Sequence, residues 1–197
     1  ITKSDVTTNI PVCHSKIRVI TWFIEFLTRL LSHNKWWTAT NPVKFTEKEK
    51  EDYKAARENI KEELYTGLAI NIGNAGDMLT GGAFQTFSSD SARSLIISLA
   101  PEEVRESLKK ILLGLCAAVK VINSQKRKVN IESLRLLTQE VMLEIVQAFP
   151  WAVLSPSVHR ILAHAWEVIQ KNNGYGLGGL SEEGIEALNK NIRQTRK

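Results

Sequence analysis

The sequence predicts an all-α protein. In every long segment of the 197-residue chain, apolar residues recur three or four positions apart, which is the period of an amphipathic helix. Residues that commonly begin helices precede several of these segments, and proline, asparagine or glycine follows them. No segment shows the strict alternation of apolar and polar residues that is typical of a half-buried strand. We therefore expect about seven helices and no sheet within this chain.

The first two expected helices differ in character. Residues 15–33 should form a helix that is buried on most sides, because aromatic residues widen its apolar stripe. The helix expected over residues 47–67 is densely charged, and Thr46 with Glu49 matches the capping box that begins many helices. The stripe of the first helix consists of Ile17, Ile20, Ile24, Leu27 and Leu31, widened by Trp22, Phe23 and Phe26.

The middle of the chain alternates between loops and helices. Residues 70–90 are rich in glycine but match no nucleotide-binding pattern, so we expect a loop with at most a helical turn near residues 77–79. The basic stretch 124–128 could contact phosphate or simply be solvated. Three further helices follow from start and stop signals: residues 90–99 after Ser89 or Asp90, residues 101–122 with Pro101 at the first helical position, and residues 131–149 after Asn130.

The composition bears on four properties of the protein: its charge, its cysteines, a membrane span and a signal peptide. A net charge of +5 and a pI near 9.2 fit an anionic partner without requiring one. The two cysteines, Cys13 and Cys116, lie far apart in sequence and are better explained as buried small side chains than as a disulfide or reactive thiols. No apolar run approaches the ~20 residues that a membrane span needs, so we expect no membrane partner. The start does not resemble a signal peptide, and we expect the chain to be a fragment of a longer protein.

The last stretch, residues 155–197, carries the most informative pattern. A helix begins at Ser155 or Ser157, runs to Lys171, and carries the histidine pair of the segment HRILAH. Asn172 and Gly174 are stop signals, and a glycine-rich break follows. A final helix should then begin at Ser181 or Glu182.

Two stripes run along this final helix. Ile185, Leu188 and Ile192 form an apolar stripe suited to packing on a core. Helical spacing by itself fits a solvated amphipathic helix with salt bridges. The other stripe, in which one carboxylate leads a row of cations, consists of Glu186, Lys190, Arg193 and Lys197.

Residues 155–197 resemble the C-terminal end of the catalytic core of the V(D)J recombinase catalytic subunit and of the related Transib-type and other recombinase-like transposases. In that family a His-x-x-x-x-His element precedes a glycine-containing linker and a helix that begins S-E-G-x-E-x-x-N-K. A weaker likeness extends upstream to about His14, through residues 71–82 and 97–115. The matching residues are His159, His164, Glu183, Gly184, Glu186, Asn189, Lys190, Arg193 and Arg196, with Glu182 as one additional residue.

The resemblance implies a division of the chain and a set of roles. Residues 1–154 would be the helical insertion domain of a DDE transposase with an RNase H-like nuclease fold. Residues 155–197 would be the histidine-pair helix, the linker and the catalytic helix, and the nuclease sheet would lie mostly outside this chain. Glu186 would be the third catalytic carboxylate and a ligand of Mg²⁺ or Mn²⁺. Lys190, Arg193 and Arg196 would contact DNA, and His159 and His164 would be half of a structural zinc site completed by cysteines outside the chain.

The function expected from this resemblance is cleavage and joining of DNA at terminal inverted repeats by metal-dependent phosphoryl transfer. It further implies a nuclear protein that acts as a homodimer, with a possible accessory recombinase subunit. The isolated chain should be inactive, since no predicted strand here carries the two remaining aspartates. Two positions depart from the family: Ile185 replaces a polar residue before the carboxylate, and Asp77 stands where an arginine is expected. The alternative is a non-catalytic, domesticated helical module that binds DNA or protein.

Overall fold

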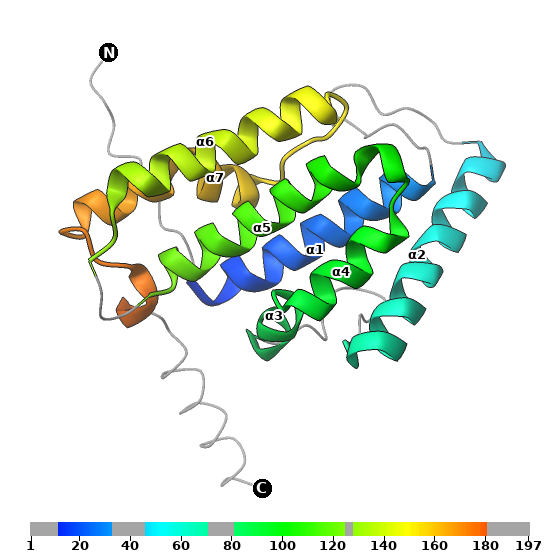
Figure 1. Cartoon of the computed structure of the whole chain (residues 1–197), viewed down its shortest axis with the longest axis horizontal. Helices are drawn as coiled ribbons and strands as arrows, with labels where there is room; N and C mark the ends of the chain where they lie inside the picture. Colours follow the sequence, from blue (N-terminus) through cyan, green and yellow to red (C-terminus); the bar gives the residue numbers. More distant parts are fainter. Residues whose placement is uncertain (1–11, 33–45, 71–80, 125–127, 181–197) are drawn as a thin grey trace, which may run out of the picture.

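The chain folds into a layered bundle of helices around one long central helix (Figure 1). The computed structural model describes residues 12–32, 46–70, 81–124 and 128–180. Within these ranges there is no strand, and a single isolated bridge joins Lys128 to Tyr175, so the all-α prediction is confirmed. The described elements are α1 (Val12–Leu31), α2 (Glu47–Leu68), α3 (Gly81–Phe87), α4 (Asp90–Leu99), η1 (Glu102–Val104), α5 (Arg105–Ile122), α6 (Ile131–Ala148), α7 (Pro156–Lys171) and η2 (Leu177–Leu180).

Helix α1 forms the centre of the core. It packs against α2, α3, α5, α7 and η2, as its apolar residues on nearly all sides predict. Phe26 stacks between Trp22 and Trp151, at centroid distances of 5.3 and 5.4 Å, and meets the edge of Phe149 at 4.9 Å. The indole Nε1 of Trp22 donates a hydrogen bond of 2.9 Å to the carbonyl oxygen of Val153. The aromatic residues of α1 are therefore core residues that join α1 to the segment between α6 and α7.

The predicted helix starts are mostly confirmed. Thr46 and Glu49 form the capping box of α2, with the Glu49 carboxylate accepting from the Thr46 backbone N–H at 2.7 Å. Ser89, Asn130 and Ser155 cap α4, α6 and α7, respectively, through their side-chain oxygens. These contacts are local in sequence, which is why a sequence pattern can predict them.

Two local predictions are wrong. Residues 81–87 were expected in a loop but form α3, because Phe84 and Phe87 are one helical turn apart and both are buried. The ring of Phe87 lies 6.0 Å from that of Phe23 on α1, and this tertiary burial outweighs the low helix propensity of Gly81 and Gly82. Pro101 precedes the helix instead of occupying its first position, because its ψ of 142° is extended and the 3-10 turn η1 follows. Residues 77–79 lie outside the described residues.

Helices α5 and α6 pack closely at Gly114. A Cβ atom on Gly114 would lie 2.1 Å from Cγ2 of Val141 and 3.8 Å from Cδ1 of Leu137. Both Gly114 and Val141 are buried, so neither helix backbone can yield toward solvent without exposing core residues. The absent side chain at residue 114 therefore sets the distance between the two helices.

Replacing Gly114 with alanine should destabilise the protein by about 1–3 kcal/mol, because the new methyl group overlaps Val141 in a packed interface. Chemical denaturation followed by circular dichroism would measure the change in the free energy of unfolding. The matched control is Gly67→Ala, whose new methyl group would meet the flexible side chain of Leu95, with Cδ2 nearest at 2.8 Å. The control should be neutral or slightly stabilising, and equal losses in the two variants would contradict the close-packing argument.

Candidate histidine pair and the segment that leads to the last helix

Helix α7 places both histidines on its outer surface. Ser155 accepts a hydrogen bond from the N–H of Val158 at 3.3 Å, and Pro156 follows it at a position where no backbone N–H is needed. The helix buries one stripe against α1, α5 and α6, and His159 and His164 lie off that stripe. His159 is exposed and His164 half-buried. The buried stripe consists of Val158, Ile161, Leu162, Ala165 and Ile169.

The two imidazole rings lie close together. Their centroids are 5.5 Å apart and their planes are inclined by 70°. Two imidazoles that share one tetrahedral zinc ion, with Zn–N bonds of about 2 Å, would have centroids ~5 Å apart. Residues five apart on an ideal helix point in directions ~140° apart, so helical spacing alone does not predict this approach. The ring separation is compatible with two ligands of one zinc ion, and it is equally that of an ordinary edge-to-face contact between two rings.

One nitrogen of His164 faces a carboxylate. Its Nδ1 atom is buried, lies 3.5 Å from Oε2 of Glu167, and makes no hydrogen bond within the described residues. Metal-binding histidines commonly direct the second ring nitrogen at a carboxylate, which orients the ring and fixes the tautomer. Glu167 was not singled out from the sequence, although its position three residues after His164 is a signal that could have identified it.

The glycine-rich break after α7 is packed against the protein. The N–H of Val129 donates to the carbonyl oxygen of Gly174 at 2.8 Å, and the N–H of Gly178 donates to that of Ser124 at 3.2 Å. Gly176 is buried, and a Cβ there would lie 2.4 Å from both oxygen atoms of Ser124. A side chain at residue 176 would therefore separate this segment from the end of α5. The described chain leaves this anchored segment at η2, beside the end of α5.

The remaining predicted site residues lie outside the described residues. These are the catalytic candidate Glu186 and the DNA-binding candidates Lys190, Arg193 and Arg196, together with Asp77 and residues 125–127 of the basic stretch. Their roles stay predictions. The described structure brings together His159 and His164, and it fixes the position from which residues 181–197 continue.

A polar cluster between α1 and α2 was not expected from the sequence. Glu25 of α1 forms ion pairs with Arg29 at 3.0 Å and with Arg57 of α2 at 3.2 Å, and it accepts a hydrogen bond from the hydroxyl of Tyr53. Burial, followed by the hydrogen bond to Glu25, raises the pKa of Tyr53. The guanidinium of Arg29 also lies 4.5 Å from the centre of the Tyr53 ring. Because each charge has a partner, we interpret this cluster as a structural contact between two helices.

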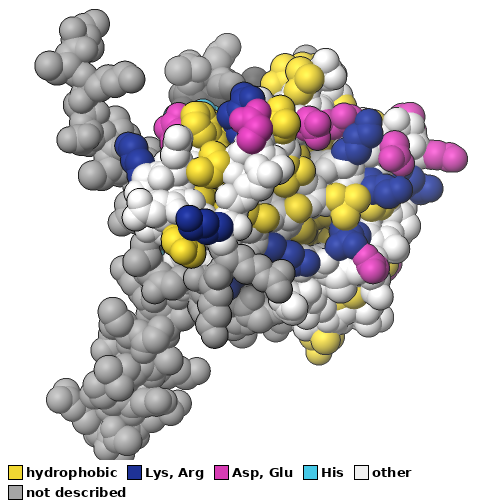
Figure 2. Space-filling model, turned by 60° about the vertical axis from the view of Figure 1, so that its left-hand side comes forward, with side chains coloured by type: hydrophobic (Ala, Val, Ile, Leu, Met, Phe, Trp, Pro, Cys, Tyr) yellow, Lys and Arg dark blue, Asp and Glu magenta, His cyan; other side chains and the backbone are white. Residues whose placement is uncertain are grey.

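The surface in Figure 2 carries charges of both signs. Lys and Arg side chains lie among Asp and Glu side chains, with hydrophobic side chains visible between them. Across residues 12–32, 46–70, 81–124 and 128–180, no three His, Cys, Asp or Glu side chains gather closely enough to hold a metal ion. None of the helices in these ranges is long and apolar enough to span a membrane.

No family model and no curated protein matches this chain. The residues themselves, the sequence resemblance and the geometry of the described residues are the basis of the proposed function.

Cys116 should be unreactive in the folded protein. Its side chain is buried in the core, and burial raises the pKa of the thiol to about 11, so the thiolate is scarce at neutral pH. In a Cys13→Ser background, alkylation by iodoacetamide at pH 8 should be at least ~100-fold slower in buffer than in denaturant. Rapid labelling of the folded protein, followed by mass spectrometry, would instead indicate an accessible thiol.

Proposed function

We propose that this chain is the C-terminal part of a recombinase-like DDE transposase, which cleaves and joins DNA by metal-dependent phosphoryl transfer. The observation that carries the proposal is the ordered recurrence, within residues 155–197, of the histidine pair, the glycine segment and the S-E-E-G-I-E-A-L-N-K helix start. Two separate elements in the family's order and at compatible spacing are more specific than either motif alone.

Two features of the described structure support the proposal. The rings of His159 and His164 lie at a separation that suits a shared zinc ion, which is the role that the resemblance gives them. The glycine segment after α7 is anchored to the end of α5 by backbone hydrogen bonds, so residues 181–197 start from a defined position. A catalytic side chain needs such fixed support, because small displacements reduce catalysis strongly.

Under this proposal, the residues of the last helix have different roles in the reaction. Glu186 supplies a carboxylate oxygen to a divalent ion, a ligand type that Mg²⁺ and Mn²⁺ prefer. Lys190, Arg193 and Arg196 hold the phosphates of the DNA next to that carboxylate. When bound, the metal ions activate the attacking oxygen and stabilise the leaving oxygen of the phosphodiester. The two partner aspartates would come from the nuclease sheet of the longer protein.

The partners follow from the same proposal. The DNA substrate would be terminal inverted repeats in the nucleus, bound by a homodimer with a possible accessory recombinase subunit. The alternative is a domesticated helical module that retains binding without catalysis. It is favoured by Ile185, which places an apolar side chain immediately before the carboxylate where the family has a polar one. Both alternatives assign the basic residues of the last helix to an anionic partner, but only the first requires Glu186.

Glu186→Gln in the full-length protein should abolish strand cleavage in both Mg²⁺ and Mn²⁺, because the amide keeps the size of the side chain but lacks the negative charge of a metal ligand. DNA binding should remain nearly unchanged. A cleavage assay and a binding assay on the same DNA would measure the two effects.

Lys190→Ala or Arg193→Ala should instead weaken DNA binding. Each variant should also reduce the slope of the logarithm of the binding constant against the logarithm of the salt concentration by about one per lost phosphate contact.

The matched control for this experiment is Glu182→Gln, which removes the same charge from the additional residue that has no counterpart in the family motif. This variant should cleave DNA normally. If Glu186→Gln cleaves like the wild type in both metals, Glu186 is not a metal ligand and the transposase mechanism is wrong.

Zinc binding by His159 and His164 should depend on residues outside this chain. Two ligands leave a tetrahedral zinc site half open, and structural sites normally use four. Metal analysis should find about one tightly held zinc per longer protein that includes an upstream CxxC, and substoichiometric zinc in the 197-residue chain. His159→Ala combined with His164→Ala should remove the zinc from the longer protein, whereas equal stoichiometric zinc in both proteins would contradict the shared site.

A further inference from the structure

One end of the bundle, where α5 ends and α6 begins, carries an excess of positive charge (Figure 1). Lys120 and Lys128 are exposed there, and neither forms an ion pair with a carboxylate within the described residues. From residue 111 to residue 135 the sequence contains one acid, Glu132. Its carboxylate accepts a hydrogen bond of 2.9 Å from Nε of Arg135, so it does not balance the lysines.

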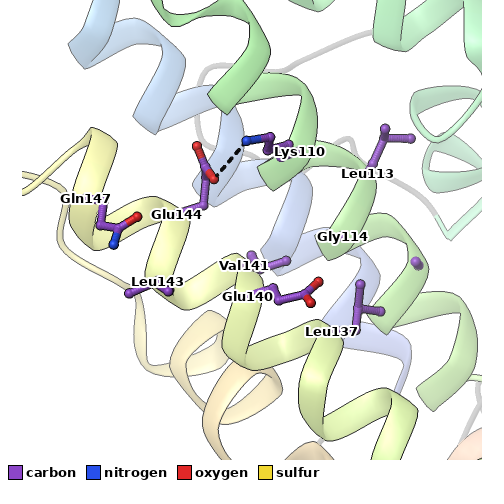
Figure 3. Close-up of a pocket in the computed structure, with 10 residues that line it drawn as sticks. Lys110, Leu113, Gly114, Leu137, Glu140, Val141, Leu143, Glu144 and Gln147 are labelled. Atoms are coloured by element: carbon purple, nitrogen blue, oxygen red, sulfur yellow. Dashed lines mark hydrogen bonds and ion pairs between the residues drawn. The ribbon is translucent and has the colours of Figure 1, made fainter.

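Other exposed lysines of α5 have acidic partners. Lys109 lies 3.7 Å from the carboxylate of Glu106, and Lys110 lies 3.4 Å from that of Glu144 on α6 (Figure 3). Both lie about 15 Å along the helix from Lys120, since ten residues of α-helix separate Lys110 from it. The positive charge that lacks an acidic partner is therefore a local feature of the end of α5.

Lys120 and Lys128 line one hollow between the end of α5 and the start of α6. Ser124 and Ser133 add polar groups to its lining. The next carboxylate along α6 is that of Glu140, seven residues or ~10 Å beyond Ser133. Cations beside apolar surface suit a ligand that is anionic and also has apolar faces. The apolar residues of the lining are Val121, Val129, Leu134 and Leu137.

An exposed aromatic ring lies beside this hollow. Tyr175 is 42% exposed, its ring centre lies 5.8 Å from Nζ of Lys128, and an isolated bridge joins the two residues. The chain turns before Tyr175, because Asn173 and Gly174 have positive φ angles of 56° and 80°. The side-chain amide of Asn172 donates to the carbonyl oxygen of Tyr175 at 3.0 Å. Backbone contacts thus hold the ring at the surface next to a lysine.

Lysines beside an exposed aromatic ring are the combination that binds a single strand of nucleic acid. The lysines attract the phosphates, and the ring stacks on an unpaired base. In a duplex the faces of the bases are already stacked on one another, so the ring would gain no such contact. An anionic membrane would use the lysines, but its headgroups offer no flat ring for Tyr175 to stack on.

We propose that the surface formed by Lys120, Lys128 and Tyr175 binds single-stranded DNA, with phosphates at the two lysines and a base stacked on the tyrosine ring. The choice of DNA over RNA rests on the proposed function, whereas the lysines and the ring act in the same way on either strand. The surface lies outside the last predicted helix, so it is an additional contact that does not involve Glu186.

Binding of the intact 197-residue chain to a fluorescent oligothymidylate of ~12 nucleotides, measured by anisotropy at several salt concentrations, tests the two lysines. Lys120→Glu with Lys128→Glu should weaken binding at least ~10-fold and reduce the salt slope by about 0.7 per lost phosphate contact. The matched control, Lys109→Glu with Lys110→Glu, changes the net charge by the same amount and should bind within ~2-fold of the wild type. The cations of the last helix are present in both variants.

The tyrosine has its own test. Tyr175→Leu should weaken binding of the oligothymidylate at least ~5-fold, because a stacked base is lost. Tyr175→Phe keeps the ring and should bind like the wild type. Binding of a duplex of the same length should be insensitive to Tyr175→Leu. Circular dichroism would verify that each variant is folded, as expected for substitutions of exposed side chains.

Equal weakening by the two lysine pairs, or binding that is unchanged by Lys120→Glu with Lys128→Glu, would overturn the proposal. Tighter binding of an RNA strand of the same length would overturn DNA as the ligand. Binding to anionic phospholipid vesicles through the same lysines, without binding to the oligothymidylate, would overturn it in favour of a membrane surface. Cleavage is not measured here, so failure of this surface is distinguishable from failure of the Glu186 mechanism.

Discussion

Burial of α1 is the constraint on which the rest of the structure depends. The helix is apolar on nearly all sides, so no single neighbour can cover it, and α2, α3, α5 and α7 are arranged around it. Its aromatic residues pack with Phe149 and Trp151 from the other end of the sequence, and the hydrogen bond from Trp22 to Val153 fixes that contact. The segment before α7 is thereby held in place, and with it the start of the helix that carries the histidines.

Two glycines, Gly114 and Gly176, allow two segments of the protein to pack closely together. Gly114 lets α5 and α6 approach each other over Val141. Gly176 lets the chain after α7 lie against Ser124, where even a Cβ atom would collide. The anchored segment thus joins the helix that carries the histidine pair to the end of α5.

Two sides of the predicted last helix differ in character. The transposase proposal uses the carboxylate of Glu186 and the cations that follow it. The predicted apolar stripe of Ile185, Leu188 and Ile192 lies on another side of the same helix. Ile185 belongs to that stripe, so an apolar side chain next to the carboxylate suits packing of the helix on a core.

The sequence by itself determined the six long helices, the caps at Thr46, Ser89, Asn130 and Ser155, and the buried stripes, because these depend on neighbours within one or two turns. It also identified His159 and His164 as a pair. Only the tertiary structure decided that Gly81–Phe87 is helical and that Glu25 pairs with Arg57. It also decided that the histidine rings meet and that the glycine segment packs on α5. Most of these features depend on contacts between residues far apart in sequence, and the histidine contact depends on the directions of the two side chains. The local periodicity of the sequence predicts neither long-range contacts nor side-chain directions.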